Sequence, residues 1–416
     1  MRNIWIWNHY AATALYDRGG RHYYFSKYLS EAGYLPTIFC ANTMHNTSNI
    51  TDIQGKLYLE QTIDGMACVF VKSPPYKGNG FSRIKNMLYF AKNVMRTAEH
   101  IGGKGNPDVI LASSVHPFTC VAGILTARKF DIPCIVEIRD LWPESIVAYN
   151  KGSKANPIVW ALYRLEKWIY KRADAVIFTM EGGAQYIRDK GWNRVIDINK
   201  IHHINNGVCL EEFDKQVYDN PIEDADLENN SIIKIAYTGS IRAANGLDAL
   251  LDAAKITYTQ NPKVHFLVWG DGDQKDRLVR RVADEGITNV KFKGRVHKKH
   301  IAYILSKCDF NYMHVAESSV TKYGASLNKL FDYFASGKPV ICDVKMGYDL
   351  IIRHNAGLAT VAQDPKTVAD VILQIANMDS EKIRQMGMNA RMAASVYNYK
   401  LLTDKLIGIL SSTSRA

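Results

Sequence analysis

The chain has 416 residues, of which 47% are hydrophobic and 22% charged, and this balance excludes a disordered or a fibrous protein. Because one ordinary domain does not grow to this length, two domains with separate cores are expected. The formal net charge of +11 favours an anionic partner, for which phospholipid headgroups, a lipid diphosphate and nucleic acid all qualify. A basic surface that merely keeps the protein in solution is the alternative.

The positive charge is concentrated in the first half of the chain. Residues 1–208 hold 25 Lys and Arg against 16 Asp and Glu, a net charge of +9, whereas the remainder has a net charge of +2. Seven cysteines occur without a C-x-x-C pair, which is typical of reduced thiols in a cytosolic protein. The opening residues do not resemble a secretory signal, and no apolar run reaches about 18 residues. Any membrane association is therefore expected to be peripheral.

Short apolar runs alternate with amphipathic stretches through the first half. Strands are predicted at 3–7, 35–40, 67–71, 109–112, 134–138 and 175–179, and helices at about 21–32, 82–101, 117–129 and 157–172. This α/β alternation predicts a parallel sheet with helices on both faces. Residues 211–228 then carry eight acidic side chains, and a linker between two domains is expected there.

The alternation restarts after this acidic stretch. Strands are predicted at 232–238, 264–269, 290–292, 310–313 and 340–343, and helices at about 246–260, 273–285, 298–306, 327–336, 366–378 and 380–397. The pattern predicts a second doubly wound unit, in which ligands bind at the carboxyl ends of the strands. The expected domains are 1–208 and 209–385, with C-terminal helices in 386–416 that return to the first domain.

Each predicted unit has a glycine turn between its first strand and its first helix. Gly19 and Gly20 occupy the first turn, and Gly239, Ser240 and Arg242 the second. Glycines at such a turn let a phosphate approach backbone N–H groups at a helix N-terminus, and an arginine can bind a diphosphate with two hydrogen bonds. A plain tight turn explains the first pair about as well.

Two further loops of the second unit carry candidate donor-site residues. Gly270 and Gly272 follow the strand at 264–269 and are expected to border a nucleoside, although a loop before a helix N-cap explains them equally well. Lys329 and Asp332, with Asn328 beside them, begin a predicted helix and share one face of it. A cation for phosphate and a carboxylate for ribose hydroxyls predict a nucleotide-diphosphate site.

Four motifs carry a resemblance to a known family: RGGR at 18–21, IRDLWPES at 138–145, NNGV at 205–208 with Phe213, and NKLFDY at 328–333 running into GKPV at 337–340. With them the chain resembles the retaining glycosyltransferases of family 4, also called group 1, over nearly its full length. The fold of that family is GT-B, in which two doubly wound, Rossmann-like domains face each other across a cleft. The DLWPES run resembles transferases of N-acetylfucosamine and N-acetylhexosamine in capsule and O-antigen pathways.

The resemblance implies a reaction and its partners. A UDP-sugar would bind the second domain, and a polyprenyl-diphosphate-linked glycan the first, with the protein at the inner face of the cytoplasmic membrane. The anomeric configuration would be retained, and neither a metal ion nor another cofactor would be required. The aspartates at 271 and 273 are accordingly not interpreted as metal ligands.

The chain also departs from the family pattern. Ser240 and Asn245 stand where much of the family has an Arg and a Lys that hold the diphosphate, so Arg242 and Lys329 are expected to supply the charge. Gly324 replaces the first acid of the family's two-glutamate motif, and Asp332 replaces the second.

The group that takes the acceptor proton is also left open by the resemblance. Arg139 stands where many family members have a histidine, and Asp140 follows it. The catalytic candidates are therefore His116, Arg139 and Asp140. A structural role for His116 is the alternative.

One predicted helix combines an apolar face with basic residues. Within 82–101 the apolar residues recur at helical spacing, and Arg83, Lys85, Lys92 and Arg96 lie elsewhere on the surface. A packed core with a solvated face is one interpretation. The other is attachment to an anionic bilayer near the lipid-linked acceptor. The apolar residues of the predicted face are Ile84, Met87, Leu88, Ala91, Val94, Met95 and Ala98.

Two other functions fit parts of this pattern. A nucleotide-sugar 2-epimerase has the same double-Rossmann architecture, but its product forms without any acceptor. A basic nucleic-acid-binding protein fits the charge, yet the sequence has no basic stripe rich in aromatic residues and no known binding module. No nucleic-acid partner is therefore predicted.

Overall fold

The structure is a computed structural model that describes residues 2–44, 50–78, 80–103, 105–114, 116–150 and 156–413. The chain forms two compact units, each with its own hydrophobic core. Unit 1 comprises Met1–Asn205 and Tyr399–Ala416, and unit 2 comprises Asn206–Asn398. Among the described residues, no helix is long and apolar enough to cross a membrane.

Unit 1 is built on an eight-stranded sheet in the order β3-β4-β2-β1-β5-β6-β7-β8. All neighbouring strands are parallel except the antiparallel pair of β3 and β4. The central strands are buried along nearly their whole length because helices cover both faces, as in doubly wound sheets. The strands are β1 (Asn3–Trp7), β2 (Leu35–Ala41), β3 (Tyr58–Ile63), β4 (Met66–Val71), β5 (Val109–Ser114), β6 (Cys134–Ile138), β7 (Ala175–Phe178) and β8 (Ile201–His203).

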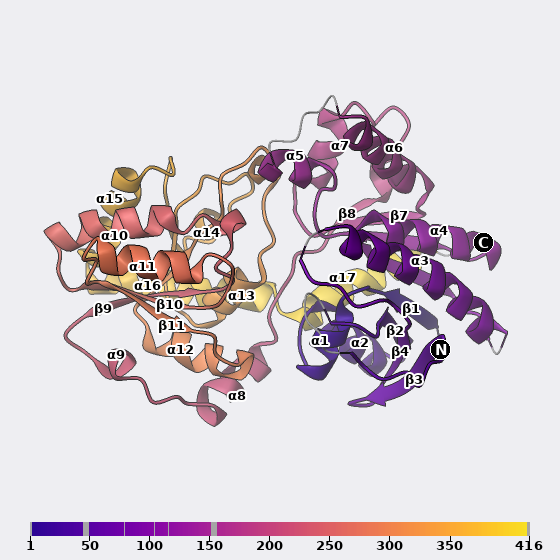
Figure 1. The fold of residues 1–416 in the computed structure, drawn as a ribbon, viewed down its shortest axis with the longest axis horizontal. Helices are drawn as coiled ribbons and strands as arrows, with labels where there is room; N and C mark the ends of the chain where they lie inside the picture. Colours follow the sequence, from indigo (N-terminus) through magenta and orange to yellow (C-terminus); the bar gives the residue numbers. More distant parts are fainter. Residues whose placement is uncertain are drawn as a thin grey trace. The chain divides into compact units, whose positions relative to one another are not determined.

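Helices α3 and α4 pack side by side on this sheet, and the last helix of the chain, α17, packs against α2 (Figure 1). Proline at the first helical position fixes the start of α4 and of α6. The helices of unit 1 are α1 (Ala11–Tyr16), α2 (Arg21–Glu31), α3 (Phe81–Gly102), α4 (Pro117–Lys129), α5 (Glu144–Asn150), α6 (Pro157–Arg172), α7 (Gly183–Asp189) and α17 (Tyr399–Ser412), with a 3-10 turn at Ile198–Lys200.

Unit 2 has a six-stranded, fully parallel sheet in the order β11-β10-β9-β12-β13-β14. Its strand order reverses between β9 and β12, whereas in unit 1 it reverses between β1 and β5. Loops after strands at such a reversal point form the ligand crevice of open α/β sheets. The strands are β9 (Ile233–Thr238), β10 (Val264–Trp269), β11 (Val290–Gly294), β12 (Phe310–Met313), β13 (Val340–Cys342) and β14 (Gly357–Ala359).

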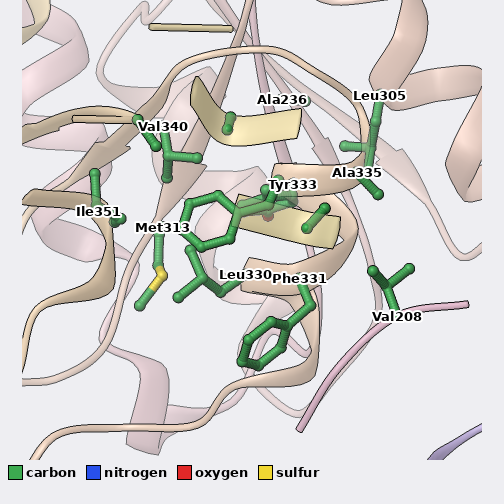
Figure 2. Packing of buried hydrophobic residues seen from close by; sticks show 14 of the residues in the cluster. Val208, Ala236, Leu305, Met313, Leu330, Phe331, Tyr333, Ala335, Val340 and Ile351 are labelled. Atoms are coloured by element: carbon green, nitrogen blue, oxygen red, sulfur yellow. The ribbon is translucent and has the colours of Figure 1, made fainter. Parts of the chain in front are cut away.

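The core of unit 2 fixes the helix that carries Lys329. Leu330, Phe331 and Tyr333 of α13 pack with Met313 and Val340 (Figure 2), which places the start of α13 beside the end of β12. The helices of unit 2 are α8 (Leu210–Asp219), α9 (Ala225–Glu228), α10 (Asp248–Gln260), α11 (Lys275–Asp284), α12 (Ile301–Lys307), α13 (Asn328–Ala335), α14 (Leu350–Arg353), α15 (Pro365–Ala376) and α16 (Ser380–Val396), with 3-10 turns at Ala243–Asn245, Lys298–His300 and Thr321–Tyr323.

Two expectations about domain organisation differ from the structure. The acidic stretch 211–228 is no free linker, because α8 and α9 bury Phe213 and Leu227 in the core of unit 2. The division between the units falls after Asn205 and again after Asn398, rather than at 208 and 385. Helix α16 stays with unit 2 because small residues such as Ala390 let it pack closely on α13, and only α17 joins unit 1.

Candidate functional site

The carboxyl edge of the unit 2 sheet, where the strands end, brings together two of the residues singled out from the sequence. Lys329 extends toward the glycine turn, and its Nζ lies 3.6 Å from the position of a Cβ at Gly239. The same ammonium lies 4.3 Å from the centroid of the Tyr237 ring and donates to the His314 carbonyl oxygen at 3.3 Å. Burial lowers the pKa of Lys329 to about 8, although the Asp343 carboxylate opposes this shift.

The glycine turn after β9 is held by its own hydrogen bonds. The Tyr237 hydroxyl donates to the Ser240 carbonyl oxygen at 3.1 Å, and the Asn245 amide donates to that oxygen and, at 2.9 Å, to Ser240 Oγ. Ser240 and Asn245 therefore bind each other where much of the family has cations. The Gly239 amide, which the sequence analysis offered to a phosphate, instead donates to the Trp269 carbonyl oxygen at 3.0 Å.

The backbone of Gly270 and Gly272 packs directly against this turn. A Cβ at Gly270 would lie 1.8 Å from the Gly239 carbonyl oxygen, and one at Gly272 would lie 2.2 Å from that of Ile241. The two loops also share backbone hydrogen bonds, including the one from the Ile241 amide to the Asp271 carbonyl oxygen at 2.9 Å. These glycines have a packing reason to be glycine, because any side chain would push the two loops apart.

The remaining donor candidates lie around the same edge without joining one another. Arg242 and Asn328 are exposed. Asp332 is half-buried, and burial raises its pKa while the nearby Lys298 opposes the shift. No salt bridge joins Asp332 to Lys329 among the described residues, so both remain available to separate parts of a ligand.

A buried histidine–aspartate pair at this edge was missed from the sequence. Asp343, directly after β13, accepts hydrogen bonds from the Tyr312 hydroxyl at 2.7 Å and from His314 Nδ1. Gln363 completes the cluster with a bond to the other carboxylate oxygen at 3.3 Å. His314 Nε2 is buried, and no hydrogen-bond partner for it is found in the described part of the chain. The sequence signal that could have indicated this pair is that His314 and Asp343 each directly follow an apolar run.

At the corresponding edge of unit 1, His116 follows β5 and is fully buried. Its Nε2 lies 2.6 Å from Nδ1 of His9, whose ring stacks on Phe90 with centroids 4.3 Å apart. Burial lowers the pKa of His116 to about 3, and the charge of Arg83 adds to the shift. His116 is therefore neutral, and it is closed off from solvent by aromatic side chains.

Beside His116 is a small cavity of about 20 Å³, room for roughly one water molecule. Its lining includes His116, Trp142 and Glu166, as well as Asp140, which is exposed as a whole residue but whose carboxyl group has its pKa raised by burial. Burial raises the pKa of Glu166 to about 8 even though the hydroxyls of two tyrosines donate to its carboxylate. Glu166 was not predicted as a site residue, because it lies inside an ordinary amphipathic helix pattern.

Arg139 directly follows β6, between Ile138 and Asp140, which both line this cavity. Its backbone N–H donates to Ser114 Oγ at 3.2 Å, and its Nε is buried with no partner among the residues that the structure describes. Of the three catalytic candidates, Asp140 is the most exposed residue, Arg139 is half-buried and His116 is fully buried.

The first glycine turn has a structural explanation. Gly19 is buried, and its amide donates to the Ala14 carbonyl oxygen at 2.9 Å; Gly20, at φ 88°, is the N-cap of α2. Arg21 of the same motif is buried and donates to Glu137 at 2.6 Å and to the Asn205 carbonyl oxygen at 2.5 Å. Gly19 and Arg21 are thus engaged within the protein, contrary to the expectation that this turn offers amide donors and arginines to phosphate.

Helix α3 presents its basic residues on two different sides. Lys85, Lys92 and Arg96 are exposed, but Arg83 is half-buried and lies close enough to His116 to lower its pKa. The predicted apolar face is also divided. Met87, Ala91, Val94 and Ala98 are buried, whereas Ile84 and Leu88 are each 47% exposed. Of the four cations offered to an anionic surface, Arg83 therefore differs from the other three in its surroundings.

The comparisons with known proteins agree with this architecture. The family descriptions "Glycosyltransferase Family 4" and "Glycosyl transferases group 1" match residues 22–212 and 233–378, respectively. The chain therefore belongs to the group 1 glycosyltransferases of family 4, and it is a glycosyltransferase with the GT-B fold of two parallel-sheet α/β units.

Its similar proteins are distant in sequence. The probable glycosyltransferase WbjE of Pseudomonas aeruginosa is 22% identical over 65% of this chain and 67% of its own. The lipopolysaccharide core biosynthesis glycosyltransferase LpsE of Rhizobium meliloti is 23% identical over 58% and 66%.

Two solved structures share the fold over nearly the whole chain. Sucrose-phosphate synthase of Thermosynechococcus elongatus has a TM-score of 0.73 at 17% identity and covers 99% of both chains. HepE of Anabaena, solved in complex with UDP and glucose, has a TM-score of 0.66 at 14% identity and covers 99% of this chain and 100% of its own.

Proposed function

We propose that this chain is a retaining glycosyltransferase of bacterial surface polysaccharide biosynthesis. It moves an N-acetylhexosamine, or a 6-deoxy-N-acetylhexosamine, from a UDP-sugar to a polyprenyl-diphosphate-linked glycan. The observation that carries the proposal is the position of Lys329, whose ammonium lies beside Gly239 at the strand-order reversal of unit 2. Support from similar proteins comes from HepE, which was solved with UDP, and from LpsE, which acts in lipopolysaccharide core biosynthesis.

The donor diphosphate would be held by charge rather than by a metal ion. Lys329 is partly buried beside the turn, and Arg242 is exposed on it, so the two cations approach the leaving group from its inner and outer sides. Such fixed charges stabilise the negative charge that develops as the glycosidic bond to the diphosphate breaks. Ser240 Oγ adds a donor to phosphate, and the half-buried Asp332 accepts hydrogen bonds from ribose hydroxyls.

The acceptor hydroxyl must lose a proton during transfer. Among the three candidates of unit 1, Asp140 is the only carboxylic acid, and it is exposed as a whole residue. Burial of its carboxyl group raises its pKa, although the charge of Arg139 opposes this shift, and a raised pKa makes the carboxylate a stronger base. His116 is enclosed and bonded to His9, so its role is structural. The proposal therefore assigns the acceptor side to Asp140.

The membrane part of the proposal rests on the charge of the first half and on α3. The net charge of +9 over residues 1–208 attracts anionic headgroups, and the exposed Phe81, Ile84 and Leu88 offer apolar contact at the bilayer surface. The DLWPES run at 140–145 supports an N-acetylated amino sugar as the group transferred.

The test is saturation-transfer NMR of the purified protein with UDP, GDP, ADP and several UDP-sugars. We expect selective binding of UDP and of one UDP-sugar, weakened about 30-fold or more in Lys329→Ala, since a charge-assisted hydrogen bond in a half-buried site is lost. Lys263→Ala, an exposed lysine just before β10 at the opposite end of the strands, is the matched control and should bind as the unchanged protein does. Absence of nucleotide binding, or equal binding by Lys329→Ala, contradicts the donor assignment.

A further inference from the structure

Unit 1 contains a second, much larger cavity, and of the candidate residues named from the sequence only Arg96 lines it. Its volume is about 630 Å³, within the range of roughly 300–1,000 Å³ that small-molecule sites occupy. It opens at the carboxyl ends of β2 and β4, where Asn42 and Lys72 directly follow the two strands. Tyr89, Asn93 and Arg96 of α3 form the opposite wall.

Hydrogen bonds hold the walls of this cavity in place. Asn42 is buried; its amide donates to the Thr51 carbonyl oxygen at 3.2 Å, and its side-chain oxygen accepts from the Ser73 amide at 2.8 Å. Asn93, also buried, ties α3 to the end of β4 by donating to the Lys72 carbonyl oxygen at 2.7 Å. The cavity is thus a built feature of the unit rather than a loose gap between a loop and a helix.

The exposed side chains of the cavity lining determine which kind of ligand can bind there. Tyr89 presents a ring that is 48% exposed, and Lys72 and Arg96 are exposed cations that form no salt bridge within the described ranges. Asp52 is the single acidic side chain of the lining and is also exposed. An aromatic ring packs on the C–H face of a pyranose, a carboxylate accepts bonds from its hydroxyls, and two cations hold a phosphate.

The side chains on the exposed surface of α3 indicate how a ligand would be oriented at this site. Successive residues of a helix are rotated by about 100° about its axis, so the side chains of α3 that face the solvent or the cavity form three neighbouring strips. The first is apolar and consists of Ile84, Leu88 and Phe81. The second is cationic and consists of Lys92, Lys85 and Arg96, and the third consists of Tyr89 and Asn93 on the cavity wall. The cationic strip therefore separates the apolar strip from the cavity. A polyprenyl-diphosphate-linked sugar has its parts in the same order, with the prenyl chain first, then the phosphates and then the sugar.

We infer that this cavity binds the lipid-proximal sugar of the acceptor as a pyranose 1-phosphate, with the ring on Tyr89 and the phosphate on Lys72 and Arg96. The inference rests on the proposed function, because it assumes a lipid-linked acceptor. It goes beyond that function by giving the acceptor a site in unit 1 that is separate from Asp140 and from the donor residues of unit 2.

The test is saturation-transfer NMR with N-acetylglucosamine 1-phosphate and galactose 1-phosphate, compared with their methyl glycosides and with inorganic phosphate as competitor. We expect the sugar phosphates to bind and the methyl glycosides to bind at least about fivefold more weakly. Tyr89→Ala should weaken sugar phosphate binding about fivefold to tenfold, and Arg96→Gln should remove the preference for the phosphate. Tyr218→Ala and Arg128→Gln change exposed side chains elsewhere and are the matched controls.

Binding is also measured in Lys329→Ala, which separates this inference from the donor assignment. Sugar phosphate signals that persist in Lys329→Ala and fall in Tyr89→Ala support the cavity even if the protein binds no UDP. Signals that fall in Lys329→Ala and persist in Tyr89→Ala would place the ligand in unit 2 and overturn the inference. It is equally overturned if no sugar phosphate binds, or if inorganic phosphate binds as well as the sugar phosphates do.

Discussion

Arg21 and Lys329 are both cations beside glycine turns, but they lie in different surroundings. Arg21 is buried against Glu137, and although burial opposes ionisation, Arg21 and His22 hold the pKa of Glu137 well below its usual range. Removing either partner would leave a buried charge alone, so this pair has a structural role. Lys329 has a ring and a carbonyl oxygen as neighbours, and no carboxylate of the described residues is bonded to it, which leaves its charge for a ligand.

The pKa of Lys329 predicts how nucleotide binding depends on pH. Burial lowers this pKa to about 8, and a bound diphosphate would raise it, so binding is strong below about pH 8 and weakens as the pH rises above it. We expect the dissociation constant of UDP to increase up to about tenfold per pH unit above 8. Titration by calorimetry between pH 6.5 and 9.5 measures this.

Lys329→Arg is the control for that pH profile, because an arginine stays charged throughout the range. Its dissociation constant, whatever its absolute value, should not change between pH 7 and 9.5. An equally steep profile in Lys329→Arg would show that another group titrates.

At the scale of an element, the apolar residues of α3 are divided between the core of unit 1 and the solvent-exposed surface. Met87, Phe90 and Val94 pack into unit 1, whereas Phe81, at 80% exposed, and Leu88 remain outside. The apolar residues of α3 therefore occupy a larger part of the helix surface than the part that the sheet and α4 cover. The excess apolar surface is what a helix at a membrane interface requires.

This excess surface predicts weakened membrane binding when it is made polar. The double variant Phe81→Ser with Leu88→Ser should bind vesicles that contain anionic phospholipid at least about tenfold more weakly, because two apolar side chains no longer enter the interface. Co-sedimentation with vesicles of mixed neutral and anionic lipid measures the partition. Leu401→Ser, an exposed leucine of α17, should bind as the unchanged protein does. Equal loss in both proteins would count against α3.

Lys85→Gln with Lys92→Gln examines the electrostatic contribution of the same helix. Each lysine near an anionic surface contributes about 1 kcal/mol, so the partition should fall about tenfold or more at low salt and differ little from the unchanged protein at high salt. A salt-independent difference would indicate a change of fold instead.

At the scale of the whole molecule, the chain combines two parallel-sheet units that differ in charge. Unit 2 carries all the donor candidates except Gly19 and Gly20, and unit 1 carries the candidates for the acceptor. A transferase needs both substrates, whereas a nucleotide-sugar 2-epimerase of the same architecture needs only one. The two functions are therefore distinguished by what the intact protein does with and without an acceptor.

We expect transfer to a short-chain lipid diphosphate-linked sugar with the anomeric configuration of the UDP-sugar retained, as read from the anomeric coupling constant in proton NMR. Release of UDP should fall at least about tenfold when the acceptor is left out, since exclusion of water limits hydrolysis. Conversion of the UDP-sugar to its 2-epimer without an acceptor would instead identify an epimerase.

Much of the fold could be predicted from local pattern, and the errors share a physical cause. The interior strands are continuous apolar runs in the sequence because both of their faces are covered by helices. The missed strands β3, β8 and β14 all lie at sheet edges, where one side is unpaired and the side chains are partly exposed. The acidic helices α8 and α9 were missed because a single buried residue anchors each of them, Phe213 in one and Leu227 in the other.

The sequence by itself determined the two-unit α/β architecture, the family and the two residues, Gly239 and Lys329, that meet at the carboxyl edge of the unit 2 sheet, because these depend on periodicity and on short motifs. Tertiary structure alone decided which cations are buried against a partner, why Gly270 and Gly272 must be glycine, and that His314 and Asp343 lie together. It also created the cavity between α3 and the ends of β2 and β4. These features join residues far apart in the chain, and a pattern within one segment carries no information about which distant segment will cover it.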